Sequence, residues 1–273
     1  MTEESKNRLQ HNQYANSGKF NARIYLHQTF GTNKYPWPLW VFDQLFQAGP
    51  ASVLELGGGN GLLWMANASR LPEQWDITVT DISPGMLQDA EKNVAGPGKK
   101  IRFEVADAEQ LQYGDAAFDI VIANHMLYHV ENRKKALLEI KRVLKPEGTF
   151  YASTVGGRNM VELKEMILAF DPDSQYEKVL GTLESQFSLD NGQDQLLEVF
   201  GDVRLALYDD ALSVTDSEAI VQYVLSLNGM DSGRTILDPG RADEFKQFID
   251  AKMAQAGGKL HISKGSGMFI CKP

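Results

Sequence analysis

The chain contains a single cysteine, Cys271, and no group of cysteines and histidines with the spacing of zinc ligands. One cysteine cannot form an internal disulfide, so a disulfide-stabilised scaffold is excluded and a structural zinc site has no support. We therefore expect no metal site and a reducing compartment, the cytoplasm.

Basic residues are scarce relative to acidic ones, because 27 Lys and Arg stand against 36 Asp and Glu and give a formal charge of −9. Proteins that hold a nucleic-acid backbone usually present a basic face, so we expect no nucleic-acid partner. Long apolar runs are missing too: polar residues interrupt the run 118–130, and the first residues have no apolar signal core. We expect no membrane association, and the oligomeric state stays open.

From about residue 50 the sequence alternates short β-branched runs with helical periods, which is typical of a parallel sheet covered by helices on both faces. In the clearest helix, 131–144, Leu137, Ile140 and Leu144 recur at helical spacing before Pro146 ends the run. Further helices are expected near 216–227 and 241–256. The expected strands are 52–56, 76–80, 101–105, 118–123, 148–154, 203–208 and 267–271.

The sharpest local signal is a strand that ends in Glu55 and leads into the glycine-rich turn 57–61. A dinucleotide fingerprint would need a further glycine at position 62 or 64, where Leu62 and Trp64 stand, so pyrophosphate binding is disfavoured. The pattern acid-x-Gly-x-Gly-x-Gly instead puts a carboxylate at the strand tip, where it favours a cationic or amine-bearing ligand. The alternative is a tight strand-to-helix connection without a binding role.

Three more strand tips carry polar groups. Asp81 ends the second strand 20 residues after Gly61, the distance at which an acid reaches a ribose diol. Asp107 follows the third strand, and Asn124 ends the fourth. All would lie at the carboxyl edge of the sheet, where doubly wound folds bind ligands.

With these motifs the sequence resembles the class I S-adenosylmethionine-dependent methyltransferases, in particular the small-molecule, methyltransferase type 11-like group. The run 81–87, Asp-Ile-Ser-Pro-Gly-Met-Leu, is similar to the family's acid-x-Ser-x-x-Met-Leu, and 143–148, Val-Leu-Lys-Pro-Glu-Gly, to its signature before the fifth strand. The resemblance covers about residues 50–155. It implies an α/β, doubly wound, Rossmann-like sheet of seven strands with the last antiparallel, and S-adenosylmethionine as cofactor.

The resemblance also implies roles for individual residues. Glu55 and the turn would face the methionine part of the cofactor, Asp81 the ribose hydroxyls, and Asp107 the adenine edge. The full set expected to contact the cofactor is Tyr14, Glu55, Gly57, Gly59, Gly61, Asp81, Ile82, Met86, Asp107, Ala108 and Asn124.

Four segments are expected on this basis. Residues 1–48 form an N-terminal helical lid, 49–157 the cofactor-binding core, 158–200 a helical cap inserted after the fifth strand, and 201–273 complete the sheet. The cap would line the acceptor pocket with apolar residues such as Met160, Leu163 and Phe187. The alternative is that the lid aromatics fill a satellite core.

A sulfonium methyl is already activated, so such an enzyme mainly aligns donor and acceptor and excludes water. An acceptor hydroxyl or protonated amine would need a base, and histidine suits that role near neutral pH. His129, in the loop after the fourth strand, is the candidate general base or acceptor-orienting residue; its alternative role is structural. Tyr35, Trp37, His125 and Tyr128 are expected to bind the acceptor, and His27 and His261 are weaker candidates.

The expected function is therefore methyl transfer to an O, N or C atom of a small molecule. The loop 124–127 lacks the Asn/Asp-Pro-Pro-aromatic run typical of enzymes that methylate amines of nucleic-acid bases. Two alternatives stay open: a catalytically silent, cofactor-binding protein with a regulatory or assembly role, and a nicotinamide oxidoreductase, against which the missing glycine argues.

Overall fold

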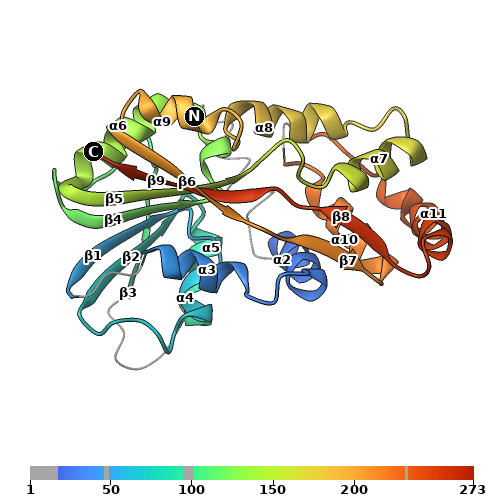
Figure 1. Ribbon diagram of the computed structural model, residues 1–273, viewed down its shortest axis with the longest axis horizontal. Coiled ribbons are helices and arrows are strands. Elements are labelled where there is room, and N and C mark those ends of the chain that lie inside the picture. The colour runs from blue at the N-terminus through green and yellow to red at the C-terminus, as the bar shows by residue number, and fades with distance from the viewer. Residues whose placement is uncertain (1–17, 46–48, 95–100, 231–232) are drawn as a thin grey trace.

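The computed structural model describes residues 18–45, 49–94, 101–230 and 233–273 (Figure 1). Its largest element is a seven-stranded sheet with the strand order β3-β2-β1-β4-β5-β9-β6. Neighbours from β3 to β5 run parallel, whereas β9 is antiparallel to both β5 and β6. The predicted seven-stranded sheet with an antiparallel last strand is confirmed. The strands are β1 Ala51–Leu56, β2 Trp75–Asp81, β3 Ile101–Val105, β4 Phe118–Asn124, β5 Leu144–Val155, β6 Asp202–Tyr208 and β9 Ser266–Lys272.

One face of the sheet is covered by α6 (Arg133–Val143) and α9 (Gly192–Leu197). The apolar face of α6, with Leu137 and Ile140, packs with Val121 and Phe150 of the strands. This helix begins two residues later than the sequence suggests, because the side chain of Asn132 accepts a hydrogen bond from the backbone N of Lys135 and caps it.

The opposite face is covered by α3 (Trp37–Leu45), α4 (Leu62–Ala66) and α5 (Pro84–Val94). Phe42 and Trp64 of these helices are almost completely buried against Trp75 and Val79 of β2. With helices on both faces, the sheet is doubly wound, as predicted.

A second lobe lies beyond the sheet, at the right of Figure 1. It has its own apolar core, which contains Leu26, Ile220 and Phe245. Two short antiparallel strands, β7 and β8, continue from the last two strands of the sheet: β7 follows β6 after two residues, and β8 precedes β9 by two. The main elements of this lobe are α2 Gly18–Phe30, α7 Val161–Phe170, α10 Ser217–Leu227, α11 Ala242–Gln255, β7 Ala211–Val214 and β8 Leu260–Ser263.

The other helical elements that the structure describes are short. η2 (Leu127–His129) follows β4, and η3 (Glu177–Gly181) continues into α8 (Thr182–Gln186) between α7 and α9. A turn at Pro239–Arg241, η4, precedes α11. Residues 201–273 thus supply two strands to the sheet and also much of the second lobe. Within the described residues, no helix combines the length and the hydrophobicity that crossing a bilayer requires.

Candidate functional site

A cavity of about 660 Å³ lies between the carboxyl edge of the sheet and the second lobe. Its wall is formed by the glycine turn, the strand tips, one face of α2, the loop after β4, and the helices α8 and α10. Most of the residues predicted as site residues lie on this wall. They are Trp37, Glu55, Gly57, Gly59, Asp81, Ile82, Met86, Asp107, Ala108, Asn124, His125, Tyr128 and His129.

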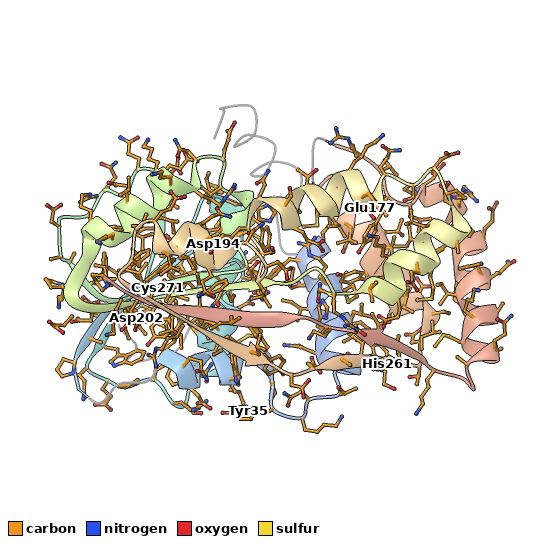
Figure 2. All side chains as sticks on the ribbon, turned by 45° about the horizontal axis from the view of Figure 1, so that its top comes forward. Tyr35, Glu177, Asp194, Asp202, His261 and Cys271 are labelled. Carbon is orange, nitrogen blue, oxygen red and sulfur yellow. The ribbon has the colours of Figure 1, made fainter. Side chains whose placement is uncertain are left out.

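Two predicted residues are not on the wall. Gly61 has φ 78°, and a Cβ there would approach Val94 to 2.7 Å, so this glycine shapes the turn into α4. Tyr35 lies at the outer edge of the molecule, 42% exposed, and its hydroxyl donates to the carboxylate of Asp43 (Figure 2). Tyr14 lies outside the described residues.

The glycine turn brings backbone close to the loop that follows β4. Gly57 has φ 68°, a conformation that L side chains rarely adopt, and a Cβ there would lie 2.8 Å from the Cβ of Met126. No larger residue fits between the two segments. The turn therefore leaves its backbone, rather than a side chain, facing the cavity.

Glu55 is the buried carboxyl group of the site, with 2% of its surface exposed. Its oxygens accept hydrogen bonds from Trp64 Nε1 at 2.5 Å and from Asn124 Nδ2 at 3.3 Å. Burial raises the pKa of Glu55 to about 7, although the two hydrogen bonds oppose this shift. A cation bound beside it would shift the group to its ionised form.

Asp81 links two segments of the wall. Its carboxyl oxygens accept hydrogen bonds from the backbone N of Gly59 at 3.0 Å and of Ser83 at 2.8 Å, while burial raises its pKa. A carboxylate has about four lone-pair positions, so it retains acceptor capacity toward the cavity. Ile82 and Met86 flank it with apolar surface. Such a combination suits a diol joined to a flat ring.

The loop after β4 holds two histidines. His125 has φ 48°, its backbone N donates to Ser153, and its ring packs on Trp37 at 5.2 Å. Burial, with a smaller effect of nearby cations, lowers the pKa of His125 to about 4 and that of His129 to about 3. Both rings are therefore neutral near pH 7, and His129 is a weak base.

Sequence reasoning missed several cavity residues. Tyr208 ends β6, Asp210 lies in the connection from β6 to β7, and Lys264 lies in the connection from β8 to β9; no local motif marks them. Tyr176 and Tyr223 come from the second lobe.

The other candidates divide between the wall and other positions. His27, weighed only as a weak candidate, lies on the wall, whereas His261 is an exposed residue of β8 (Figure 2). Met160 and Phe187 line the cavity, and Leu163 belongs to the core of the second lobe.

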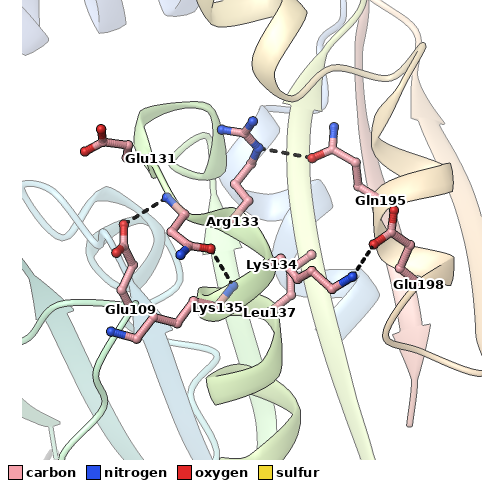
Figure 3. Close-up of a pocket in the computed structure, with 9 residues that line it drawn as sticks. Glu109, Glu131, Arg133, Lys134, Lys135, Leu137, Gln195 and Glu198 are labelled. Carbon is pink, nitrogen blue, oxygen red and sulfur yellow. Dashed lines mark hydrogen bonds and ion pairs between the residues drawn. The ribbon is translucent and has the colours of Figure 1, made fainter.

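A second cleft, of about 720 Å³, lies beside the start of α6 and contains none of the predicted site residues (Figure 3). Several of its charged groups are already engaged: Arg133 Nε donates to Gln195 at 3.0 Å, and Lys134 pairs with Glu198 at 3.0 Å. In the part of the chain that the structure describes, no three His, Cys, Asp or Glu side chains are grouped to hold a metal. The cavity at the sheet edge is therefore the candidate site.

Fold and site define a class I S-adenosylmethionine-dependent methyltransferase domain. Residues 54–152 match the family model described as a methyltransferase domain, and this part of the chain belongs to that family. The family, the enzyme class and the cofactor class predicted from the sequence are confirmed for this domain.

The chain is similar to curated methyltransferases over part of its length. It is 32% identical to a malonyl-[acyl-carrier protein] O-methyltransferase of Geobacter sulfurreducens over 126 residues, which are 45% of this chain and 46% of the relative. It is 37% identical to a ubiquinone/menaquinone biosynthesis C-methyltransferase of Hydrogenovibrio crunogenus over 98 residues, 35% of this chain and 39% of the relative. The chain thus matches less than half of the length of each.

Solved structures share the fold over more of the chain. A putative methyltransferase from an antibiotic biosynthesis pathway of Anabaena variabilis matches with a TM-score of 0.61 and 15% identity, over 86% of this chain and 96% of that one. Phosphoethanolamine N-methyltransferase 2 of Haemonchus contortus, in complex with S-adenosyl-L-methionine, matches with a TM-score of 0.60 and 16% identity, over 98% and 60%. At these identities the likeness concerns the fold.

Proposed function

We propose that the protein transfers the methyl group of S-adenosylmethionine to an O, N or C atom of a small, largely apolar molecule. One observation carries this proposal: a single cavity extends from the strand tips with Asp81 and Asp107 to apolar helices of the second lobe. Donor and acceptor would meet there in a fixed orientation and away from water, which is the main requirement of methyl transfer.

In this proposal the sheet edge holds the cofactor. Glu55 faces its amine-bearing methionine part, Asp81 accepts hydrogen bonds from the ribose hydroxyls, and Ile82 and Met86 contact the adenine faces. The buried position of Glu55 supports the first role, because a carboxylate buried without a counter-ion is stabilised when a cation binds beside it. Asp107 and Ala108 would contact the adenine edge.

The loop after β4 would hold the acceptor beside the methyl group. We assign His129 to orienting the acceptor, together with His125, Tyr128 and Trp37. The lowered pKa of His129 supports orientation over proton removal, because so weak a base does not readily accept a proton near neutral pH. The fully buried Cys271 fits a reducing location such as the cytoplasm.

Calorimetry with S-adenosylhomocysteine and NAD in parallel tests the cofactor, and we expect binding of the first only. A screen with isotope-labelled S-adenosylmethionine over phenols, amines, carboxylates and heterocycles then tests transfer. Binding of S-adenosylhomocysteine without turnover of any acceptor would favour the catalytically silent alternative. Binding of NAD instead would contradict the proposal.

A further inference from the structure

The end of the cavity nearest the second lobe contains a buried ion pair. Lys264 Nζ lies 2.6 Å from Asp210 Oδ2, and their side chains are only 9% and 3% exposed. Both residues line the cavity. They come from the two short connections, 209–210 between β6 and β7 and 264–265 between β8 and β9, that join the sheet to the second lobe.

The two partners of this ion pair differ in how many hydrogen bonds they form. Asp210 also accepts hydrogen bonds from the backbone N of Asn33 and of Ala211, each at 2.9 Å. The Lys264 ammonium group has three N–H donors and, among the described residues, donates only to Asp210. Two donors on a buried cation therefore remain for a ligand in the cavity.

His27 of α2 adds a second polar group to this region. Its Nδ1 is buried and has no hydrogen-bond partner in the described part of the chain, and its ring meets Tyr223 edge-on at 5.5 Å. Buried polar atoms are rarely left unpaired in folded proteins, so this atom indicates a missing ligand group or water. After burial, the charge of Lys264 is the largest cause that lowers the pKa of His27, to about 3, and that of His125, to about 4. The ammonium group and both rings line the same cavity.

Apolar side chains form the remaining surface of this half of the cavity. They come from α2, the start of α7, the segment around α8, and the end of α10, and include Ile24, Met160, Leu180, Phe187, Leu227 and Met230. A ligand that fills this space needs an apolar body and one strongly polar group.

We propose that the acceptor binds here as an anion: an apolar molecule with an ionisable oxygen, as in a phenol, enol or carboxylic acid, whose oxygen accepts hydrogen bonds from Lys264 and His27. This inference rests on the proposed methyltransferase function and specifies the acceptor class of the same site. Lys264 is the residue that selects the ionised form.

The chemistry then needs no base in the transfer step. The acceptor gives its proton to solvent when it binds. Its electron pair, on oxygen or on the conjugated carbon of an enolate, forms the bond to the methyl carbon while the carbon–sulfur bond breaks and leaves its pair on sulfur. A negative and a positive charge disappear together, a change that a cavity shielded from water favours.

Burial by itself opposes ionisation of the acceptor, so the charge of Lys264 must compensate for it. The titratable groups around Lys264 each keep one protonation state near neutral pH. The histidines stay neutral, burial raises the pKa of Tyr208 to about 12, and hydrogen bonds and Lys264 hold the pKa of Asp210 low despite burial. The groups that face Lys264 or its flanking strand are Asp210, His27, His125, Tyr208 and Glu162.

The test uses para-nitrophenol, whose anion has its own visible absorbance band, with the full chain in the presence and absence of S-adenosylhomocysteine. We expect the probe to bind as the anion with an apparent pKa below its value in water. The methyl ether para-nitroanisole, which cannot ionise, should bind at least about tenfold more weakly. A parallel titration with para-nitrobenzoate distinguishes a carboxylic acid from a phenol as the preferred acceptor.

Three variants locate the effect. Lys264→Met should weaken binding of the anion on the order of tenfold to a hundredfold, while Lys264→Arg should restore most of it. Lys264→Met leaves Asp210 buried without its counter-ion. The double variant Asp210→Asn/Lys264→Met removes both charges, so it tests the loss of the ammonium group without leaving an unpaired carboxylate. Lys259→Met removes a lysine charge from an exposed position before β8 and should change nothing.

Unchanged anion affinity in the double variant, or a bound probe that stays protonated, would overturn the inference. So would a loss of S-adenosylhomocysteine affinity in Lys264→Met with probe binding intact, because the ammonium would then serve the cofactor. Failure of the unaltered protein to bind S-adenosylhomocysteine would instead count against the proposed function, and the probe titration without it remains informative.

Discussion

Trp64 Nε1 donates a hydrogen bond of 2.5 Å to Glu55 Oε2, and both side chains are almost completely buried. The indole belongs to the short helix that follows the glycine turn, so the turn and the carboxyl group at the tip of β1 are joined by one contact. Burial raises the pKa of Glu55 from 4.5 to about 7. Between these values the folded protein binds more protons than the unfolded chain, so its stability falls as pH rises through this window.

We first predict that Glu55→Gln stabilises the protein without cofactor. At pH 8 the free energy of unfolding should rise by up to about 3 kcal/mol, because one pKa unit corresponds to about 1.4 kcal/mol and the amide oxygen still accepts the indole bond. The gain should vanish near pH 4, where Glu55 is protonated in both states. Urea unfolding at the two pH values measures this, with the exposed Glu73→Gln as control. Equal stability of the variant and the parent at pH 8 would contradict the assignment of a raised pKa.

The second prediction concerns the pH dependence of cofactor affinity. If the amine of S-adenosylhomocysteine binds beside ionised Glu55, binding must displace a proton below pH 7, the pKa of the free protein. Affinity should therefore fall as pH decreases below 7, by at most about tenfold per pH unit for one coupled proton. Calorimetry from pH 5 to 8 measures the slope. Glu55→Gln should bind more weakly and lose this slope; a slope that persists in the variant would assign it to another group.

The third prediction tests Asp81. Asp81→Asn should weaken S-adenosylhomocysteine binding on the order of tenfold to a hundredfold, because it removes charge-assisted hydrogen bonds to the ribose. The matched control is Asp76→Asn, the same change at the opposite end of β2, where Asp76 pairs with Arg102 on the surface. The ribose role is refuted if both variants bind like the parent protein.

The fourth prediction concerns the cover that α2 forms over the glycine turn. A Cβ built on Gly59 would lie 3.6 Å from the Phe20 ring, and Asn60 donates a hydrogen bond to Asn21 at 3.1 Å. Phe20→Ala should therefore weaken cofactor binding several-fold with little change in melting temperature. Tyr25→Ala, an exposed aromatic on the same helix, is the control. Affinity equal to that of the control would mean that α2 does not cover the cofactor.

The fifth prediction distinguishes the two roles of His129. Once an acceptor is identified, orientation by the ring predicts a kcat about tenfold lower in His129→Asn, whereas loss of a general base typically costs a hundredfold or more. With a pKa of about 3, His129 should add no ionisation to the pH profile of the parent enzyme between pH 5 and 8. A histidine-like inflection in that range, absent from the variant, would restore it as the base.

The core of the fold was predictable because its signals are local. Strands β1 to β4 begin and end within one residue of the expected positions, since each combines β-branched residues with a polar tip. β5 begins four residues early, at Leu144, because Leu144 pairs with Phe118 before the register shifts. The pair of β7 and β8 was not predicted: each has four residues, and their partners are about fifty residues apart.

The candidate site likewise contains residues that local sequence signals predict and residues that they do not. Glu55, Asp81 and Asp107 are recognisable because each lies at or just after the end of a strand, at a spacing that has a chemical meaning. Lys264 and Asp210 carry no such signal, because only pairing of strands distant in the chain brings them together. The sequence thus predicts the cofactor half of the cavity and says little about the half that would choose the acceptor.

The position of α2 has a consequence for how the protein is made. Arg23 donates to the backbone oxygen of Ser226, 203 residues further along the chain, and Gly31 pairs with Leu212 of β7. During synthesis α2 leaves the ribosome long before α10 and β7. The face of α2 that is buried in the folded protein, with Leu26, therefore stays exposed until those elements have been synthesised. The wall that closes the cavity therefore forms last, and any nascent-chain factor that protects α2 would act before the enzyme has a binding site.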